Sequence, residues 1–461
     1  MVIYNSHTKQ KEKFIPIKNN DVKIYVCGPT VYDDAHLGHA RSSISFDLLR
    51  RTLKMNGYNV TFVKNFTDID DKIINKMNQT KKSLKEITEF YINSYLNDMD
   101  KLNVQRADIE PKATESLEAM FELIKLLEEK DYTYRLNDDI YFDTSKDSEY
   151  CHLSHKCQED TESRIDTTGK KNPADFALWK ACKGEDDVCF DSPFGKGRPG
   201  WHIECSAMIK KHIAYDYEYQ IDIHGGGADL FFPHHENEEA QSSCAYDNHL
   251  AKYWMHNGFV NINGEKMSKS LGNSFFVKDA LKVYDGEILR YYLLCTHYRS
   301  NFNFNEEDLL VSKKRLDKLY RLKKRIYNKP ASNTNKKFKQ AILNALSDDL
   351  NISKALSIID EMINISNEKL DDNPKDKSVQ KEIAANINFI AKLLGVGLKD
   401  SFKYFQLGIL EEEKNKIEEL LKQRNEAKKE KNYNKADLIR KKLLDMDIKI
   451  MDTPDGTVWE K

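Results

Sequence analysis

A short apolar strand that leads into a helix near the start of the chain constrains the fold most. Residues 22–26 are apolar or favour strands, and Cys27-Gly28-Pro29 ends the run. A helix is predicted to begin near Gly38, and strand-forming residues return at 59–63, before the acidic turn at 67–71. Strand, turn, helix and strand in this order make a βαβ unit, so we expect an α/β fold around a parallel sheet of the kind that binds nucleotides.

The remaining sequence divides where its composition changes. A chain of 461 residues is long enough for about three domains. Residues 131–198 are polar and weakly periodic, which indicates an insertion between two halves of the sheet, and the sequence is helical almost throughout from Glu306. The expected divisions are the first half of the α/β domain at 1–130, the insertion at 131–198, the second half at 199–257, a linking module at 258–310, a helical bundle at 311–400 and a small C-terminal domain at 401–461.

The bulk composition restricts the class of protein. Charged residues make up 32% of the chain, and no apolar run approaches the roughly 18 residues that span a membrane. No secretory signal pattern is present, so we expect a cytosolic protein without a membrane partner. The eight cysteines are scattered, which favours reduced thiols and metal ligands over a disulfide framework. A formal net charge of −2 does not indicate nucleic-acid binding, so any basic face must be local.

The run His36-Leu37-Gly38-His39 falls at the predicted turn from strand to helix. Gly38 lets the backbone approach a ligand closely, and the N-terminus of a helix offers free N–H groups to phosphate oxygens. Both imidazoles can donate hydrogen bonds to a phosphate while negative charge develops on it. Taken alone, such histidines are more often structural than catalytic.

Two glycine-containing segments add candidate nucleotide contacts. Lys266-Met267-Ser268-Lys269-Ser270 carries two ammonium groups between Gly264 and Gly272, so this loop is expected to close over a triphosphate. A solvated loop is the ordinary alternative. His224-Gly225-Gly226-Gly227-Ala228-Asp229 permits close contact with a flat ligand and places a carboxylate where ribose hydroxyls would lie.

Two sets of residues are candidate metal ligands. His234 and Glu238 are four residues apart and share one face if helical, but His235 and Glu239 have the same spacing, and spacing alone does not separate the pairs. A second set, Cys151-His152-Leu153-Ser154-His155-Lys156-Cys157 with Cys182 and Cys189 nearby, leaves another metal site open, although an insertion loop with incidental Cys and His is favoured.

The basic segment at 422–442 is a candidate for binding RNA. Such a basic face suits a sugar-phosphate backbone, although a charged run of this kind is most often the solvent-exposed side of a helix. Tyr433 can stack on a base, and Asp437 and Asp452 can accept hydrogen bonds from the amino groups of guanine or cytosine.

The two runs His36-Leu37-Gly38-His39 and Lys266-Met267-Ser268-Lys269-Ser270, in this order, resemble the paired signatures of class I aminoacyl-tRNA synthetases. Together with Tyr25-Val26-Cys27-Gly28, Trp201-His202-Ile203-Glu204-Cys205 and Phe232-Pro233-His234-His235-Glu236-Asn237-Glu238, they resemble the cysteinyl-tRNA synthetase family from Tyr25 to Trp459. The resemblance implies a Rossmann-type parallel-sheet catalytic domain split by an insertion, then a helical bundle and a small C-terminal anticodon-binding domain. It also implies activation of L-cysteine with ATP and its transfer to tRNA-Cys by a cytosolic monomer.

The same resemblance assigns roles to single residues. It implies one zinc ion at Cys27, Cys205, His234 and Glu238, and Mg²⁺ that accompanies ATP. Implied roles are catalysis for His36, His39, Lys266 and Lys269; ATP binding for Thr30, Gly38, His39, Gly226, Asp229 and Lys269; the amino-acid pocket for Thr67 and Trp201; and anticodon contacts for Lys428, Tyr433, Asp437 and Asp452. The sequence departs from the family at Tyr433, where Trp is frequent, and at Lys428, where Arg is common; lysine lacks the bidentate fork of arginine.

Without the resemblance, Cys27 and Cys205 would be interpreted as buried core cysteines. Three other functions remain as alternatives: a ligase that joins activated cysteine to an amino sugar, a non-catalytic zinc-containing RNA-binding protein, and a methionyl-tRNA synthetase. The C-terminal segment argues against the first. The intact histidine and lysine motifs argue against the second, and the ligand set argues against the third.

Overall fold

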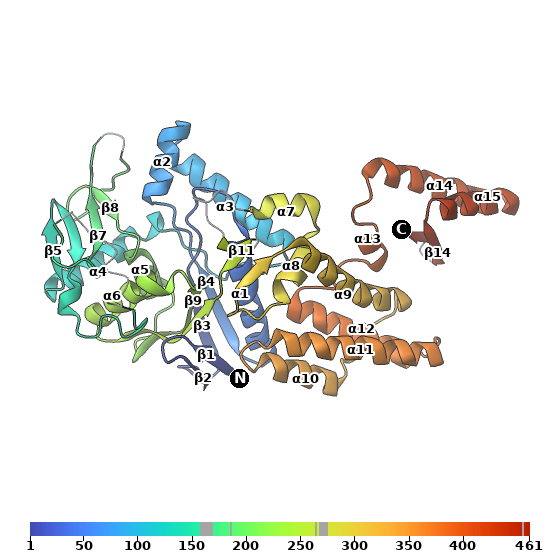
Figure 1. Cartoon of the computed structure of the whole chain (residues 1–461), viewed down its shortest axis with the longest axis horizontal. Coiled ribbons are helices and arrows are strands. Elements are labelled where there is room, and N and C mark those ends of the chain that lie inside the picture. Colours follow the sequence, from blue (N-terminus) through green and yellow to red (C-terminus); the bar gives the residue numbers. More distant parts are fainter. Residues whose placement is uncertain (157–168, 185–186, 263–264, 267–274, 454–455) are drawn as a thin grey trace. The chain divides into compact units, whose positions relative to one another are not determined.

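The computed structural model describes residues 1–461 except 157–168, 185–186, 263–264, 267–274 and 454–455. The chain forms two compact units (Figure 1). The first comprises Met1–Leu309 and Gln340–Ile358, and the second comprises Leu310–Lys339 and Ile359–Lys461. Among the described residues, no helix combines the length and the apolar character needed to cross a membrane.

A four-stranded parallel sheet in the order β10-β9-β3-β4 forms the centre of the first unit. Helix α1 connects β3 to β4, which confirms the predicted βαβ unit. Because all four strands are parallel, their carboxyl ends meet at one edge, where α/β folds bind ligands. The elements are β3 (Asp21–Val26), α1 (Leu37–Met55), β4 (Asn59–Lys64), β9 (Tyr219–Gly227) and β10 (His249–Asn257).

Further helices and short strands complete the first unit. The side chain of Asp70 caps α2 by accepting from the backbone N–H of Lys72, and a Ser83–Glu86 capping box starts α3. The helices are α2 (Asp71–Thr80), α3 (Leu84–Lys101), α4 (Leu117–Glu129), α5 (Ile203–His212), α6 (Glu236–Tyr246), α7 (Val277–Val283) and α8 (Gly286–Leu294). The strands are β1 (Val2–Asn5), β2 (Gln10–Lys13), β11 (Val260–Ile262), β12 (Glu265–Lys266) and β13 (Phe302–Phe304).

The predicted insertion contains a regular antiparallel sheet that weak periodicity did not reveal. Its order is β5-β6-β7-β8, and it carries buried aromatic side chains such as Phe142 and Trp179. The strands lie apart from α1 within the first unit (Figure 1). They are β5 (Thr133–Leu136), β6 (Asp139–Phe142), β7 (Phe176–Ala181) and β8 (Gly197–Pro199).

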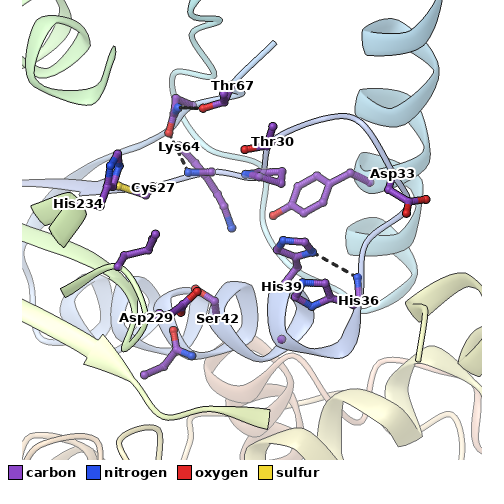
Figure 2. A pocket seen from close by; sticks show the side chains of 18 of the residues that line it. Cys27, Thr30, Asp33, His36, His39, Ser42, Lys64, Thr67, Asp229 and His234 are labelled. Carbon is purple, nitrogen blue, oxygen red and sulfur yellow. Dashed lines mark hydrogen bonds between the residues drawn. The ribbon is translucent and has the colours of Figure 1, made fainter. Parts of the chain in front are cut away.

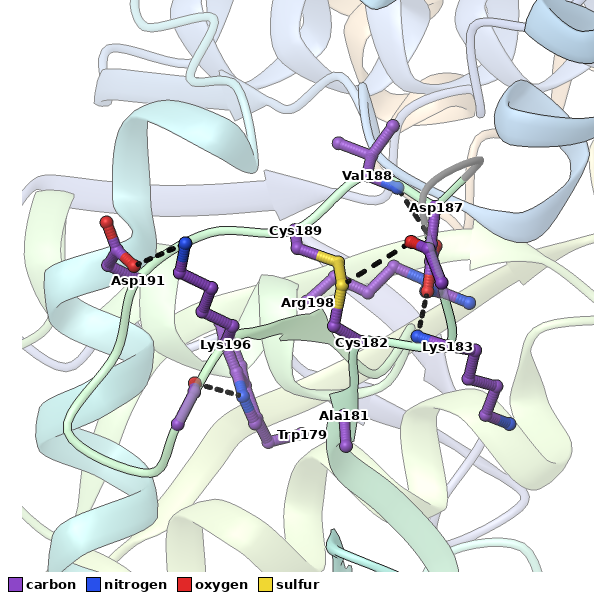
Figure 3. The surroundings of a disulfide bond; sticks show 12 residues. Trp179, Ala181, Cys182, Lys183, Asp187, Val188, Cys189, Asp191, Lys196 and Arg198 are labelled. Atoms are coloured by element: carbon purple, nitrogen blue, oxygen red, sulfur yellow. Dashed lines mark hydrogen bonds and ion pairs between the residues drawn. A yellow bond between two sulfur atoms is a disulfide. The ribbon is translucent and has the colours of Figure 1, made fainter.

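The preference for reduced thiols and metal ligands over disulfides is wrong at this sheet. Cys182 and Cys189 form a disulfide between β7 and β8, with their Cα atoms 5.7 Å apart (Figure 3). Cys151 is also disulfide-bonded. The spacing of cysteines along the sequence does not reveal which thiols lie close together in the fold. Here β7 and β8 pair antiparallel, and the segment that connects them brings Cys189 back beside Cys182.

The second unit is helical with a small terminal hairpin. In its C-terminal part, Trp459 packs with Ile417, Leu421 and Ile448 in a separate apolar core. Helix α9 begins in the first unit, and α11 crosses the boundary at Ile358. The elements from α9 onward are α9 (Glu306–Arg325), α10 (Lys336–Leu346), α11 (Ile352–Asp372), α12 (Lys377–Leu394), α13 (Ser401–Phe405), α14 (Glu411–Lys429), α15 (Tyr433–Asp445), β14 (Lys449–Thr453) and β15 (Gly456–Glu460).

Candidate active site and metal centre

A cavity of about 330 Å³ opens at the carboxyl edge of the parallel sheet. Side chains from the segment after β3, from α1, from the end of β4 and from the segments after β9 point into it (Figure 2). The sequence-predicted residues that line it are Cys27, Thr30, His36, Gly38, His39, Thr67, Trp201, Cys205, Asp229 and His234. The cavity therefore joins most of the predicted amino-acid and nucleotide contacts in one space.

Four predicted metal ligands meet at one end of this cavity. Cys27 Sγ lies 3.6 Å from both Cys205 Sγ and Glu238 Oε1, and Cys205 Sγ lies 3.9 Å from His234 Nε2. His234 Nε2 and Glu238 Oε1 are 2.8 Å apart. All four side chains are buried, and their ligand atoms lie within 4.8 Å of one another.

These separations fit a tetrahedral zinc site. Bonds of about 2.0–2.3 Å place neighbouring tetrahedral ligands roughly 3.3–3.8 Å apart. Three of the four distances between ligand atoms lie at or near this range, and the contact between His234 and Glu238 is shorter. Two thiols, an imidazole and a carboxylate are also the ligand types that zinc binds.

The structure separates the two histidine–glutamate pairs that share one spacing. Glu239 accepts hydrogen bonds from His249 Nδ1 at 2.7 Å and from the backbone N–H of Leu250, so its carboxylate is engaged outside the cluster. His235 lies beside the cluster, with its Nε2 3.4 Å from Cys27 Sγ. Cys27, His224, His235 and Glu238 therefore form a second, overlapping group of possible ligands.

Two of the four ligands are favoured in the ionised forms that a metal binds, whereas burial raises the pKa of the Cys27 thiol. Burial opposes ionisation of Glu238, but the positive charges of His234 and His224 hold the pKa of its carboxyl well below the usual range. Burial likewise opposes ionisation of Cys205, yet its contacts with Cys27 and His234 lower the pKa of this thiol to about 6. Cysteine and glutamate bind zinc in their ionised forms.

A second layer of side chains orients two of the four ligands, Glu238 and His234, and the sequence interpretation did not give His224 or His202 this part. His224 Nε2 lies 2.6 Å from Glu238 Oε2, and its Nδ1 lies 3.2 Å from the carbonyl oxygen of Tyr25. His202 Nδ1 lies 3.0 Å from His234 Nδ1, and Trp201 stacks on His234 with ring centroids 4.3 Å apart. Such partners fix the tautomer and direction of a ligand.

The N-terminus of α1 lines the cavity through His36, Gly38 and His39. His36 is the N-cap residue, and His39 Nδ1 accepts a hydrogen bond from its backbone N–H at 3.2 Å. The two imidazole rings stack with centroids 3.7 Å apart (Figure 2). This arrangement presents backbone N–H groups and two imidazoles to the cavity, a combination of donors that suits a phosphate.

The glycine run after β9 contributes one wall. Gly227 and Asp229 line the cavity, whereas Gly226 is buried behind it and is not among the lining residues. A Cβ on Gly226 would lie 2.9 Å from the side chain of Leu230 and 3.0 Å from the ring of His235. Packing against a histidine of the metal end therefore gives a structural reason for glycine at 226.

The lysine loop lies mostly outside the described residues. Lys266 belongs to strand β12, which pairs with β11. Lys269 falls in the range 267–274 and is not described.

Two polar residues at the cavity were not predicted: Asn65, which lines it, and Glu204, which is buried behind Thr67 and is not among the lining residues. Asn65 Oδ1 accepts a hydrogen bond from the backbone N–H of Gly28 at 2.8 Å. The Thr67 hydroxyl donates to Glu204 Oε2 at 2.7 Å. Burial raises the pKa of Glu204 well above its usual value, against the opposing effect of that hydrogen bond.

The Cys151 loop gives no metal cluster among its described residues, 151–156. The backbone N–H of Cys151 donates to Glu236 Oε1 at 2.8 Å, and the His155 ring stacks on His7. Cys157 lies outside the described residues. This loop therefore packs as part of the first unit.

The predicted RNA-binding residues occupy two different environments in the C-terminal part. Tyr433 is 62% exposed and Asp437 is also exposed on α15. Asp452 instead accepts two hydrogen bonds from Arg424, at 2.8 and 2.9 Å, and lies 3.0 Å from Lys428 Nζ. Its carboxylate is thus shared with two cations, and Arg424 was not predicted.

Comparison with known proteins places this geometry in a family. Residues 13–314 match the catalytic domain of class I (C) tRNA synthetases, and residues 341–399 match the DALR domain. The chain is 69% identical over 464 aligned residues to a cysteine–tRNA ligase of Nitratiruptor sp., with all of both chains covered. It is 65% identical to one of Sulfurovum sp., again over all of both chains, and 58% identical to one of Wolinella succinogenes over all of this chain and 99% of the relative.

Solved structures share the fold at low sequence identity. A Mycobacterium tuberculosis methionyl-tRNA synthetase in complex with methionyl-adenylate aligns with a TM-score of 0.60 and 14% identity, over 85% of this chain and 95% of that one. A putative arginyl-tRNA synthetase from Campylobacter jejuni aligns with a TM-score of 0.55 and 12% identity, over 83% and 94%. The full-length matches carry the identification further: the chain belongs to the cysteine–tRNA ligases, a family of class I aminoacyl-tRNA synthetases.

Proposed function

We propose that the enzyme activates L-cysteine with ATP and transfers it to the 3′-terminal adenosine of tRNA-Cys, and that a zinc ion selects the amino acid. One observation carries this proposal. Four buried metal-ligating side chains stand at one end of a cavity whose other end is formed by the N-terminus of α1.

The metal end explains selectivity. Cysteine and serine differ by sulfur for oxygen, and a pocket that relies on shape separates such close analogues by only roughly 100-fold. Zinc held by Cys27, Cys205, His234 and Glu238 would supply an electrophile that prefers a thiolate to a hydroxyl. Trp201 lines this end of the cavity and is half-exposed, so its ring can close the pocket around a small side chain.

The nucleotide end supports the first chemical step. An oxygen of the cysteine carboxylate attacks the α-phosphorus of ATP, and the bond to the β-phosphate oxygen breaks to release pyrophosphate. His36 and His39 donate hydrogen bonds to the phosphate oxygens as charge develops. Lys266 and Lys269 are proposed to neutralise the triphosphate, with Mg²⁺ accompanying ATP. Thr30, Gly38, Gly226 and Asp229 are proposed contacts of the nucleotide.

The second step joins cysteine to RNA. The 3′-terminal adenosine hydroxyl attacks the carbonyl carbon of the adenylate, and AMP leaves. Tyr433, Asp437, Lys428 and Asp452 are the proposed anticodon contacts, within the proposed C-terminal domain at 401–461. Exposure of Tyr433 and Asp437 supports their part, because an anticodon base needs an accessible ring and acceptor.

The test is charging of a tRNA-Cys transcript with labelled cysteine and ATP, with serine as competitor. We expect charging with cysteine and none with serine. In Cys27→Ser, bound zinc and the preference for cysteine should fall together. Cys244→Ser is the matched control, because Cys244 is also a buried free cysteine but lies outside the cluster. A zinc-free enzyme that charges cysteine with undiminished selectivity would exclude the proposed role of the metal.

A further inference from the structure

Lys64 is a cavity residue to which the proposed function gives no part. It is the last residue of β4 and lines the same cavity as the metal ligands and the α1 histidines. Its side chain extends into the space between Cys27 and His39 (Figure 2). The Lys64 Nζ atom donates to Ser43 Oγ at 2.8 Å and lies 5.4 Å from the centroid of the Tyr95 ring.

The position of Lys64 is fixed from both ends of the cavity. Its backbone pairs with Val26, the residue directly before the metal-end Cys27. Its hydrogen-bond partner Ser43 donates in turn to the backbone carbonyl of His39 at 2.8 Å, and Ser43 also contacts the Tyr95 hydroxyl at 2.9 Å. The ammonium group therefore lies between the end that would hold the cysteine sulfur and the end that would hold the phosphates.

No described carboxylate neutralises the charge of Lys64. Within the ranges that the structure describes, Lys64 has a hydroxyl and a ring as partners and no carboxylate within ion-pair distance. Lys278 shows the contrast, because it forms an ion pair with Asp34, which also lines the cavity. A half-buried ammonium without a counter-ion favours a bound anion.

The substrates supply such an anion at this place. When the thiol of cysteine lies at the metal end and the phosphates at the start of α1, the carboxylate and the α-phosphate must meet between them. We propose that Lys64 is a further catalytic residue, whose ammonium binds the anionic oxygens at this junction of carboxylate and α-phosphate. This inference rests on the proposed function for the placement of the two substrates.

The experiment compares ligands that differ only in the relevant charge. Lys64→Gln keeps a polar side chain that can reach Ser43 but removes the charge, and Lys64→Met is a second neutral variant. Lys64→Arg restores the charge. Lys252→Met is the matched control, since Lys252 is also a half-buried lysine on a strand of the parallel sheet. It lies on β10, donates to the backbone carbonyl of Ile15 at 2.9 Å and is not among the residues that line the cavity. Binding of L-cysteine, cysteamine, AMP and adenosine is measured by calorimetry, and activation by pyrophosphate exchange.

We expect Lys64→Gln to bind L-cysteine or AMP at least tenfold more weakly while cysteamine and adenosine, which lack the anionic group, change by less than twofold. Its kcat in pyrophosphate exchange should fall about 100-fold or more, with recovery in Lys64→Arg and little change in Lys252→Met. A larger loss for L-cysteine assigns the contact to the carboxylate, and a larger loss for AMP assigns it to the phosphate.

Equal losses for charged and uncharged ligands, or exchange within threefold of the wild type in both neutral variants, would overturn the proposal. The wild-type enzyme separates this failure from failure of the proposed function. If the wild type exchanges pyrophosphate with cysteine but Lys64 variants are unaffected, only the role of Lys64 is lost. If the wild type itself shows no cysteine-dependent exchange, the substrate placement is wrong and the inference is overturned with it.

Discussion

His234 Nε2 and Glu238 Oε1 lie 2.8 Å apart although the two residues belong to different local structures. His234 lies in the irregular helical turn Phe231–His235, and Glu238 lies in the first turn of α6. The turn runs directly into α6, so the two residues are about one helical turn apart and their side chains project from the same side. A sequence spacing of four thus becomes a pair of adjacent ligand atoms.

His224 is expected to position Glu238 for metal binding. Its Nε2 lies 2.6 Å from Glu238 Oε2, so His224→Ala should free this carboxylate and lower zinc affinity about 10- to 100-fold. The measurement is zinc competition with a chelator. His249→Ala is the control, because His249 forms a similar pair with Glu239 at 2.7 Å and is exposed. Equal zinc affinity in the two variants would contradict the assignment.

Gly28 is expected to tolerate no side chain. A Cβ at this position would lie 1.5 Å from the carbonyl oxygen of Asn65, so Gly28→Ala must push apart the ends of β3 and β4. We expect a loss of about 1–3 kcal/mol in unfolding free energy and a marked loss of pyrophosphate exchange. Gly57→Ala meets no atom within 4 Å and carries only the cost of its positive φ, so its exchange activity should persist. Thermal unfolding and exchange assays of both variants provide the check.

Asp98 is expected to make stability depend on pH. It is 1% exposed, its Oδ2 has no hydrogen-bond partner among the described residues, and burial raises the pKa of its carboxyl to about 6 against the opposing charge of Lys101. The folded chain therefore holds this proton more tightly than the unfolded chain, whose Asp titrates near 3.8. Stability from this group is present below pH 3.8 and is lost as the pH rises to about 6.

Asp98→Asn should remove that loss. We expect the variant to gain up to roughly 3 kcal/mol over the wild type at pH 7.5 and clearly less at pH 4.5. Unfolding midpoints at the two pH values measure the difference. Asp100→Asn is the control, since Asp100 is exposed and forms an ion pair with Arg106. A gain for Asp98→Asn that is independent of pH would be inconsistent with a titrating carboxyl.

Tyr433 is expected to affect tRNA and not amino-acid activation. Stacking of a base on an exposed aromatic ring contributes about 1–3 kcal/mol, so Tyr433→Ala should raise the KM for tRNA-Cys roughly 5- to 100-fold. Pyrophosphate exchange without tRNA should stay at the wild-type rate. Leu438→Ala, on the same helix and 69% exposed, should change neither quantity. An unchanged KM in Tyr433→Ala would exclude base stacking at this position.

Local sequence signals predicted the elements around the site well. The apolar run at 22–26, the helix near Gly38 and the strand at 59–63 correspond to β3, α1 and β4, and the motifs indicated the family. Periodicity and turn chemistry are properties of a few neighbouring residues, so they can be interpreted before the chain is folded.

Other features depended on contacts between distant segments. Whether His234 or His235 pairs with a cluster glutamate, whether Gly226 or Gly227 faces the cavity, and which cysteines form a disulfide follow from the packing of strands and loops. The sequence by itself determined the βαβ start, the set of chemical groups and the family. Only the tertiary structure decided which of those groups share one cavity, and it added His224 and Lys64 to the site. The physical reason is that residues tens to hundreds of positions apart become neighbours through the alignment of the parallel strands, which spacing along the chain does not specify.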